Sequence, residues 1–257
     1  MSRLPFAILV SVLVSSPLAA QPAAKEGGKL SIRWHGQSFY EIRTSAGTRI
    51  VIDPHAIEAY GPKLVKADLI LFTHPHSDHT QFQAVENWQK VKVIGGVKDA
   101  GGRQVTWNNV DEKFKDVHIR TVGTFHDTMN GMRRGLNSVI ILEVDGFRIV
   151  HLGDLGHLLS AAQVREIGAV DVLMIPVGGV YTINGSEAKD VVAQLKPRYL
   201  VLPMHHGTRV YQDLLGPEEF LEDQKNVKKY TTNEISLDVG QKPPEEPSIA
   251  LLTWADR

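Results

Sequence analysis

The sequence predicts an α/β (α+β) fold in which two mixed β-sheets pack against each other and helices lie outside them. Two observations support this class. Strand patterns follow one another through the first part of the chain, and strand and helix patterns then alternate twice in the second part. No stretch rich in Pro and Gly divides the middle of the chain, so we expect one domain over residues 29–257.

The first strands are predicted by alternating apolar and polar residues, as at Leu30–Trp34. A turn pattern at Ser45–Thr48 separates two further strands, and this spacing is typical of antiparallel hairpins. A continuous apolar run at Leu69–Thr73 indicates a buried strand. In this part of the chain we expect strands over 30–34, 38–43, 49–53, 69–73 and 91–94, and a short helix over 81–90.

In the second part of the chain, sequence patterns typical of strands alternate with patterns typical of helices. Asp145-Gly146 separates two strand patterns and is typical of a two-residue hairpin turn. Pro217 is suited to the first position of a late helix. We expect strands over 117–122, 138–144, 147–152, 170–176, 197–204 and 249–254, and helices over 160–167, 186–195 and from 217 onward.

Residues 1–20 have the pattern of a secretory signal peptide. Arg3 precedes a short apolar run, and small residues around Pro17 follow it. The run is shorter than the ~20 residues that span a bilayer. We therefore expect cleavage near Ala20, a flexible lead-in over 21–28, a periplasmic or secreted protein and no stable membrane insertion after cleavage. An uncleaved membrane anchor is the alternative.

The composition excludes several classes of site. The chain has no Cys, which rules out disulfides, Cys-ligated zinc, Cys nucleophiles and iron–sulfur clusters. Its formal net charge of −1 provides no basic field, so we expect a small-molecule substrate and no nucleic-acid partner. The sequence favours no particular oligomeric state. The unusual count is that of His, of which there are 11.

Four potential metal ligands lie together directly after the predicted strand 69–73. They are His74, His76, Asp78 and His79. Imidazole and carboxylate groups without thiolates suit Zn²⁺, Mn²⁺ or Fe²⁺. A polar solvated loop is the alternative, but three His and one Asp within six residues favour a metal site.

Three more candidates follow other predicted strands. His126 follows 117–122, Asp154 follows 147–152 and His205 follows 197–204. Residues at strand ends gather on one rim of a fold, where binding sites are common. We therefore expect these side chains to join the first four.

The motif His-x-His-x-Asp-His at 74–79, followed by His126, Asp154 and His205, resembles that of the metallo-β-lactamase superfamily. The resemblance covers essentially the whole mature chain. Within the superfamily, the sequence is most similar to the L-ascorbate-6-phosphate lactonase-like group of metal-dependent hydrolases. Further landmarks of that group lie at 34–38, 52–54, 134–138, 151–157 and 176–183. The resemblance implies a four-layer αββα sandwich.

The resemblance also implies two divalent metal ions, most simply Zn²⁺, with Mn²⁺ or Fe²⁺ as alternatives. His74, His76 and His126 would hold one ion, Asp78, His79 and His205 would hold the other, and Asp154 would bridge them. True β-lactamases of this fold generally lack the bridging Asp, so we expect an enzyme without that activity. The choice of His205 over its neighbour His206 rests on the resemblance.

The expected reaction is hydrolysis by a metal-bridged hydroxide, because paired cations lower the pKa of a shared water toward ~7. Asp78 would orient that hydroxide and act as general base. The leading hypothesis is an exported dinuclear hydrolase of a small ester, lactone or phosphoester. A phosphodiesterase or phospholipase-type hydrolase is the alternative, and a non-catalytic zinc-binding protein is a further one.

Other residues either contact the substrate or support the ligands, or they have ordinary packing and surface roles. Asp53 could hold a ligand His, and the Arg133-Arg134 pair could grip an anionic substrate. The full set is His35, Asp53, His55, Arg133, Arg134, His151, His157, Tyr181, Thr182 and His206.

Overall fold

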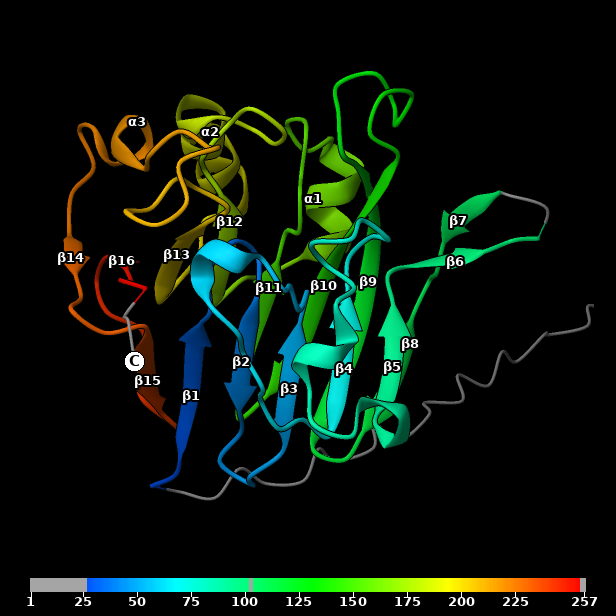
Figure 1. The fold of residues 1–257 in the computed structure, drawn as a ribbon. Helices are drawn as coiled ribbons and strands as arrows, with labels where there is room; N and C mark the ends of the chain where they lie inside the picture. The colour runs from blue at the N-terminus through cyan, green and yellow to red at the C-terminus, as the bar shows by residue number, and fades with distance from the viewer. Residues whose placement is uncertain (1–26, 102–103, 255–257) are drawn as a thin grey trace, which may run out of the picture.

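Two β-sheets pack face to face in the computed structural model, which describes residues 27–101 and 104–254 (Figure 1). The first sheet has the strand order β15-β1-β2-β3-β4-β5. Its first three strands in sequence form antiparallel hairpins, as predicted, and β3, β4 and β5 are parallel. The strands are β1 (Lys29–Trp34), β2 (Tyr40–Arg43), β3 (Arg49–Ile52), β4 (Leu69–Phe72), β5 (Lys92–Gly95) and β15 (Glu234–Asp238).

The second sheet has the order β14-β16-β13-β12-β11-β10-β9-β8. It is antiparallel from β8 to β11 and parallel from β11 onward. A separate hairpin joins β6 (Val97–Asp99) to β7 (Val105–Trp107). The strands of the second sheet are β8 (Asp111–Phe114), β9 (Val117–Phe125), β10 (Leu136–Val144), β11 (Phe147–His151), β12 (Val172–Pro176), β13 (Leu200–Met204), β14 (Val227–Lys229) and β16 (Ser248–Leu251).

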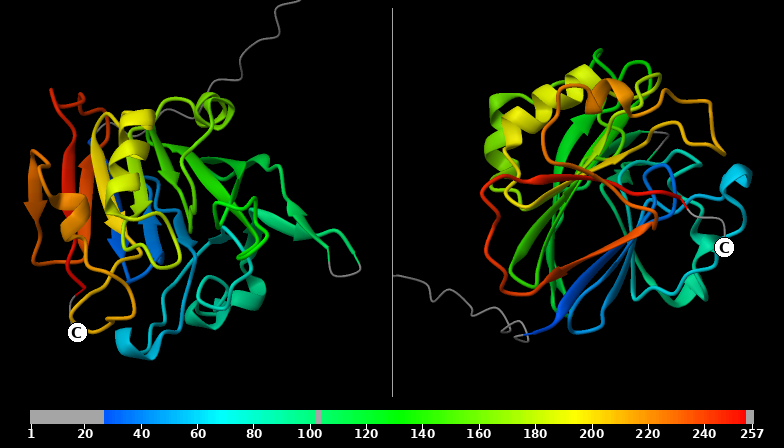
Figure 2. Two further views of the ribbon diagram at one scale, coloured as in Figure 1. Left: turned by 90° about the horizontal axis from the view of Figure 1, so that it is seen from above. Right: turned by 90° about the vertical axis from the view of Figure 1, so that its left-hand side faces the viewer.

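The helices α1 (Ala161–Ile167), α2 (Gly185–Leu195) and α3 (Glu218–Leu221) lie beside the second sheet, away from the first (Figure 2). Both longer helices begin with a capping box, in which Ser160 pairs with Gln163 and Asn184 with Glu187. These reciprocal hydrogen bonds satisfy backbone groups that the first turn leaves unpaired. The predicted helices 160–167 and 186–195 are confirmed.

The predicted helix over 81–90 is wrong. The segment forms two 3₁₀ helices, η2 (Phe82–Ala84) and η3 (Trp88–Lys90). Val85 between them is extended and forms a β-bridge with Val65, while Asn87 has a left-handed backbone with φ of 52°. With η1 (Glu58–Tyr60), these short turns line the outer side of the first sheet.

The core between the sheets comes from alternate residues of facing strands. Leu30, Ile32 and Trp34 of β1 point to it, as do Ile140 and Leu142 of β10. All five are at most 1% exposed, and full burial of such a side chain contributes about 1.5–3 kcal/mol. A second apolar cluster lies between the other sheet and the helices. The predicted fold class of two mixed sheets with helices outside is therefore confirmed.

Turns join the two sheets at one end of the sandwich. The β10–β11 hairpin has the predicted two-residue turn, with φ of 53° at Asp145 and 80° at Gly146. Asp145 accepts hydrogen bonds from the backbone N–H and the hydroxyl of Ser45, in the β2–β3 turn of the other sheet. The hydroxyl of Thr48 in the same turn donates to Asp116. These side-chain contacts hold the two sheets together at this end.

The predicted signal peptide over 1–20 and most of the lead-in over 21–28 lie outside the described residues. Within residues 27–101 and 104–254, no helix combines the length and apolar character needed to cross a membrane.

Candidate metal centre

All seven predicted ligands meet at the opposite end of the sandwich. His74, His76, Asp78 and His79 lie on the loop that follows β4, so the first sheet supplies four of them. The second sheet supplies one ligand after each of three strands: His126 after β9, Asp154 after β11 and His205 after β13. The site therefore spans the junction of the two sheets.

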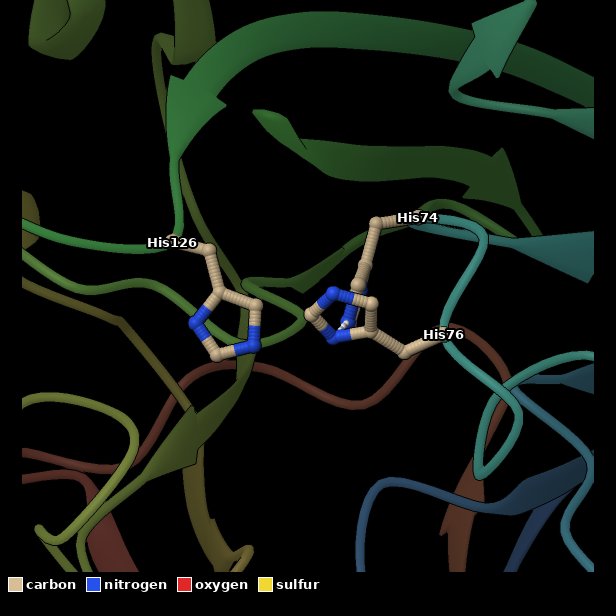
Figure 3. Close-up of side chains that lie close together, drawn as sticks. All are labelled: His74, His76 and His126. Atoms are coloured by element: carbon tan, nitrogen blue, oxygen red, sulfur yellow. Dashed lines mark hydrogen bonds between the residues drawn. The ribbon is translucent and has the colours of Figure 1, made fainter. Parts of the chain in front are cut away.

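The first ligand group is formed by His74, His76 and His126. Their rings face one another from two loops (Figure 3), with centroid separations of 4.5 Å for His74–His76, 4.8 Å for His74–His126 and 5.0 Å for His76–His126. His74 and His126 are buried, whereas His76 is exposed. This group opens to solvent on the side of His76.

The second ligand group contains Asp78, His79, Asp154 and His205. Oδ2 of Asp154 lies 3.2 Å from Nε2 of His79 and 3.1 Å from Nε2 of His205. The same oxygen also lies 3.2 Å from Nε2 of His126 and 3.9 Å from Nε2 of His74, which belong to the first group. One carboxylate oxygen thus faces imidazole nitrogens of both groups.

The donor atoms fit divalent cations. Nε2 of His79 is buried and makes no hydrogen bond among the described residues, although two carboxylates lie close to it. Burial opposes the charge of Asp154, but the imidazoles of His205 and His79 outweigh it, so the pKa of this carboxyl lies well below its usual range. Clustered imidazoles around an ionised carboxylate, with no thiolate, match the ligand preferences of Zn²⁺, Mn²⁺ and Fe²⁺.

Asp53 supports two of the ligands from the end of β3, as the sequence suggested. Its Oδ2 lies 3.0 Å from Nδ1 of His79. Its oxygens also accept hydrogen bonds from the backbone N–H and Oγ1 of Thr73, at 2.7 and 2.8 Å. Oγ1 of Thr73 in turn lies 3.0 Å from Nδ1 of His74. Such partners fix the tautomer and orientation of a ligand imidazole.

Asp154 is held by Ser38 and Asn137, which the sequence reasoning did not select. Oγ of Ser38 donates to Oδ1 of Asp154 at 3.1 Å, and the side-chain oxygen of Asn137 accepts from its backbone N–H at 3.0 Å. Both residues fall within segments 34–38 and 134–138, which carried the resemblance noted from the sequence, and this was the available signal.

His151 lies next to the ligands and contacts their support. It donates from Nε2 to the carbonyl of Ser38 at 2.9 Å, and its Nδ1 accepts from the N–H of Gly153 at 3.1 Å. Burial lowers the pKa of His151, which favours the neutral imidazole. Both hydrogen bonds require this form, with the proton on Nε2. His151 therefore connects the end of β11 with the residue that holds Asp154.

The four other histidines that were candidate site residues lie apart from both ligand groups. His35 is 3.3 Å from Glu41, and His55 packs against Phe39 and Tyr60. The remaining two are His157, whose Nε2 accepts from the N–H of Phe125, and His206, whose ring stacks on Trp34 at 5.3 Å. The structure brings His205 rather than His206 to Asp154, in line with the resemblance.

The predicted substrate residues lie on two loops that contact each other beside the site. Arg134 donates to the carbonyl of Val180 at 3.0 Å, and its guanidinium lies 5.4 Å from the ring centroid of Tyr181. The hydroxyl of Thr182 bonds to the backbone of Ile183, which gives it a local role. Arg133 is exposed.

Asp127, directly after His126, shapes the first of these loops and was missed from the sequence. Its carboxylate accepts hydrogen bonds from four backbone N–H groups, at 2.7–2.9 Å. The donors are Met129, Gly131, Arg133 and Arg134. Burial acts against the charge, but these donors lower the pKa of Asp127. A carboxylate followed closely by Gly was the sequence signal for such a turn.

Comparison with known proteins identifies the superfamily to which this chain belongs. A family model described as a β-lactamase superfamily domain matches residues 31–205. A solved structure from Thermotoga maritima, proposed to be a Zn-dependent hydrolase of the metallo-β-lactamase superfamily, has 32% sequence identity and a TM-score of 0.62. The match covers 87% of this chain and 98% of that one.

Curated relatives narrow the class to one family. A UPF0173 protein of Pyrococcus furiosus is 31% identical over 202 residues, which are 74% of this chain and 89% of the relative. A UPF0173 metal-dependent hydrolase of Thermococcus onnurineus is 31% identical over 195 residues, or 70% and 85%. The chain belongs to the β-lactamase superfamily and, within it, to the UPF0173 metal-dependent hydrolases. The predictions of the superfamily and of a metal-dependent hydrolase are confirmed.

Proposed function

We propose that this protein is an exported dinuclear metallohydrolase that cleaves a small ester, lactone or phosphoester. The observation that carries the proposal is the position of Asp154. Its Oδ2 lies 3.1–3.2 Å from Nε2 of His79, His126 and His205, which come from both ligand groups. A carboxylate placed between two sets of ligands is suited to bridging two cations.

His74, His76 and His126 would hold one cation, Asp78, His79 and His205 the other, and Asp154 both. When bound, the cations would lower the pKa of a water molecule and offset negative charge that develops on the substrate. Zn²⁺ is our first choice because imidazole-rich sites without thiolates are common for it, and Mn²⁺ or Fe²⁺ are the alternatives.

Asp78 is suited to handling the proton. Its carboxylate is partly exposed, whereas Asp154 is almost fully buried, so Asp78 is the acid of the site that an incoming substrate can reach. Its Oδ2 lies 3.7 Å from Nε2 of His79, close to the ligands. From this position it would accept a proton from the attacking water and pass it toward the leaving group.

Asp154→Asn tests the two-metal assignment, because it preserves the volume of the side chain and removes its charge. We expect a folded variant that retains about one metal per chain fewer than the parent and loses hydrolysis by orders of magnitude. Elemental analysis and turnover on an ester, lactone and phosphodiester panel provide the measurements. Two retained metals with near-parental turnover would contradict the assignment.

The matched control is Asp190→Asn, an exposed position on α2. Asp171 is unsuitable for this purpose, although it lies at the far end of the sandwich. It is 1% exposed, and its Oδ1 lies 2.7 Å from a guanidinium nitrogen of Arg198. Export has a separate test: the mass of the intact protein recovered from the periplasm or medium should lack about the first twenty residues.

A further inference from the structure

Large exposed apolar side chains gather on loops beside the candidate ligands. Within residues 27–101 and 104–254, nine large hydrophobic residues are exposed, and five of them lie on three loops at the metal end of the sandwich. Single exposed apolar residues need no explanation, but a concentration of them beside a site does. We call this set the apolar rim: Met129, Met132, Val180, Tyr181 and Leu215.

Contacts between the three loops make the rim one surface. The loop of Met129 and Met132 is tied to the loop of Val180 and Tyr181 through Arg134, which bonds one and covers the ring of the other. The third loop joins through Leu215, whose N–H donates to the carbonyl of Gly178 at 3.1 Å.

The rim adjoins the ligands directly. The N–H of Gly178 donates to the carbonyl of His205 at 3.1 Å, and a Cβ atom on Gly178 would lie only 2.3 Å from that oxygen. On the other side, the Met129 loop begins at Asp127, the residue after His126. The rim therefore flanks both ligand groups.

Val180 of the apolar rim has an unfavourable backbone conformation. Its φ of 61° is left-handed, a conformation that β-branched residues rarely adopt, and its side chain is 50% exposed. Strained backbone of this kind is unfavourable and clusters at functional sites. Packing does not explain an apolar residue that is both strained and exposed, and a place on a substrate-binding surface would account for it.

The charges beside the apolar rim indicate that the rim contacts a substrate and not a membrane surface. Arg133 is exposed, and its guanidinium makes no hydrogen bond or ion pair with any described residue. One free cation suits one anionic group of a bound molecule. The chain as a whole has a net charge of −1, which would not draw it to anionic lipid.

We propose that the substrate carries an aliphatic chain of several carbons, which packs on the apolar rim while the group to be cleaved lies at the metal centre. This inference rests on the proposed hydrolase function and specifies its substrate class as an anionic ester or lactone with an aliphatic tail. Arg133 would pair with the negative charge of that molecule.

Linear carboxylates test the proposal without requiring the true substrate, because a carboxylate is the product of ester or lactone cleavage. Acetate, butanoate, hexanoate and octanoate are titrated calorimetrically into the zinc-loaded protein. A fully buried methylene strengthens binding by up to about fourfold, so hexanoate should bind at least about tenfold more tightly than acetate. Met132→Ser combined with Leu215→Ser should flatten the series and leave acetate affinity unchanged.

Leu64→Ser is the control, since Leu64 is 64% exposed and lies outside the three loops. Zinc-dependent acetate binding without any effect of chain length would overturn the rim proposal and leave the hydrolase proposal standing. Failure to bind zinc would count against the hydrolase proposal itself. Binding to phosphatidylglycerol vesicles, or dimerisation, that disappears in the double variant while chain length has no effect would make the rim a docking surface and also overturn the inference.

Discussion

Nδ1 of His79 lies 3.0 Å from Oδ2 of Asp53, and both side chains are fully buried. This contact directs the other nitrogen of His79 to Asp154, 3.2 Å away. Burial opposes a proton on His79, but the charges of Asp154 and Asp53 outweigh it and raise the pKa of this imidazole well above its usual value. Asp53 therefore orients a candidate ligand without belonging to either candidate ligand group.

Asp53→Asn should weaken metal binding. The amide can no longer stabilise a donated imidazole N–H by charge, and loss of such a partner typically lowers metal affinity by about 10–100-fold. A competitive zinc titration against a chromogenic chelator measures this directly. Asp190→Asn serves again as the control, and unchanged affinity in Asp53→Asn would show that Thr73 alone fixes the loop.

Ser38→Ala should have a comparable effect on the same measurement. The hydroxyl of Ser38 donates to Oδ1 of Asp154 at 3.1 Å, and a hydrogen bond to a charged group contributes about 1.5–3 kcal/mol. We expect zinc affinity to fall about tenfold or more, while the metal-free protein keeps its fold because the lost group is small. Ser236→Ala, on an exposed position of β15, should change neither property.

Penicillins and cephalosporins should be poor substrates. The site has Asp154 between its two ligand groups and the chain has no Cys, so its ligand set differs from those expected of true β-lactamases. Hydrolysis of a chromogenic cephalosporin by the zinc-loaded protein should remain near the background rate. Efficient turnover would overturn the proposed substrate class.

His55 should make the metal-free protein less stable in acid. Burial lowers the pKa of His55 to about 4, from an ordinary value near 6.5. The unfolded chain therefore binds a proton between these values that the folded protein does not. The associated stability is complete above pH 6.5 and is lost as the pH falls toward 4, by up to about 3 kcal/mol.

His55→Phe removes this titration and keeps a ring against Phe39 and Tyr60. Denaturant unfolding in chelator at several pH values should show a shallower loss of stability in the variant than in the parent. Equal slopes would mean that His55 takes up its proton in the folded state as readily as in the unfolded one.

The grouping of the seven candidate ligands could be predicted because each carries a local signal. Four lie within six residues after an apolar run, and the others directly follow strands whose patterns are clear. Their support could not be predicted in the same way, since Ser38 reaches Asp154 across 116 residues. No period or spacing in the chain encodes that contact.

The elements that sequence reasoning missed or misassigned are weakly patterned. β15 is an edge strand with a single buried residue, and it pairs with β1 from near the other end of the chain. The segment 81–90 has polar and apolar residues at helical spacing, but Val85 is 1% exposed in a β-bridge and packs against the first sheet. Tertiary packing outweighed local propensity there.

Different contacts hold the two sheets together at the two ends of the sandwich. At one end, Ser45 and Thr48 bond to Asp145 and Asp116, contacts that need no ion. At the other, the loop after β4 meets the ends of β9, β11 and β13 around Asp154. A cation held there would connect the two sheets at that end, whereas the turns at the other end connect them without an ion. Chelation should then let the sheets separate at the end that carries His126 and His205, so that amide hydrogen exchange quickens there and is unchanged around Gly146.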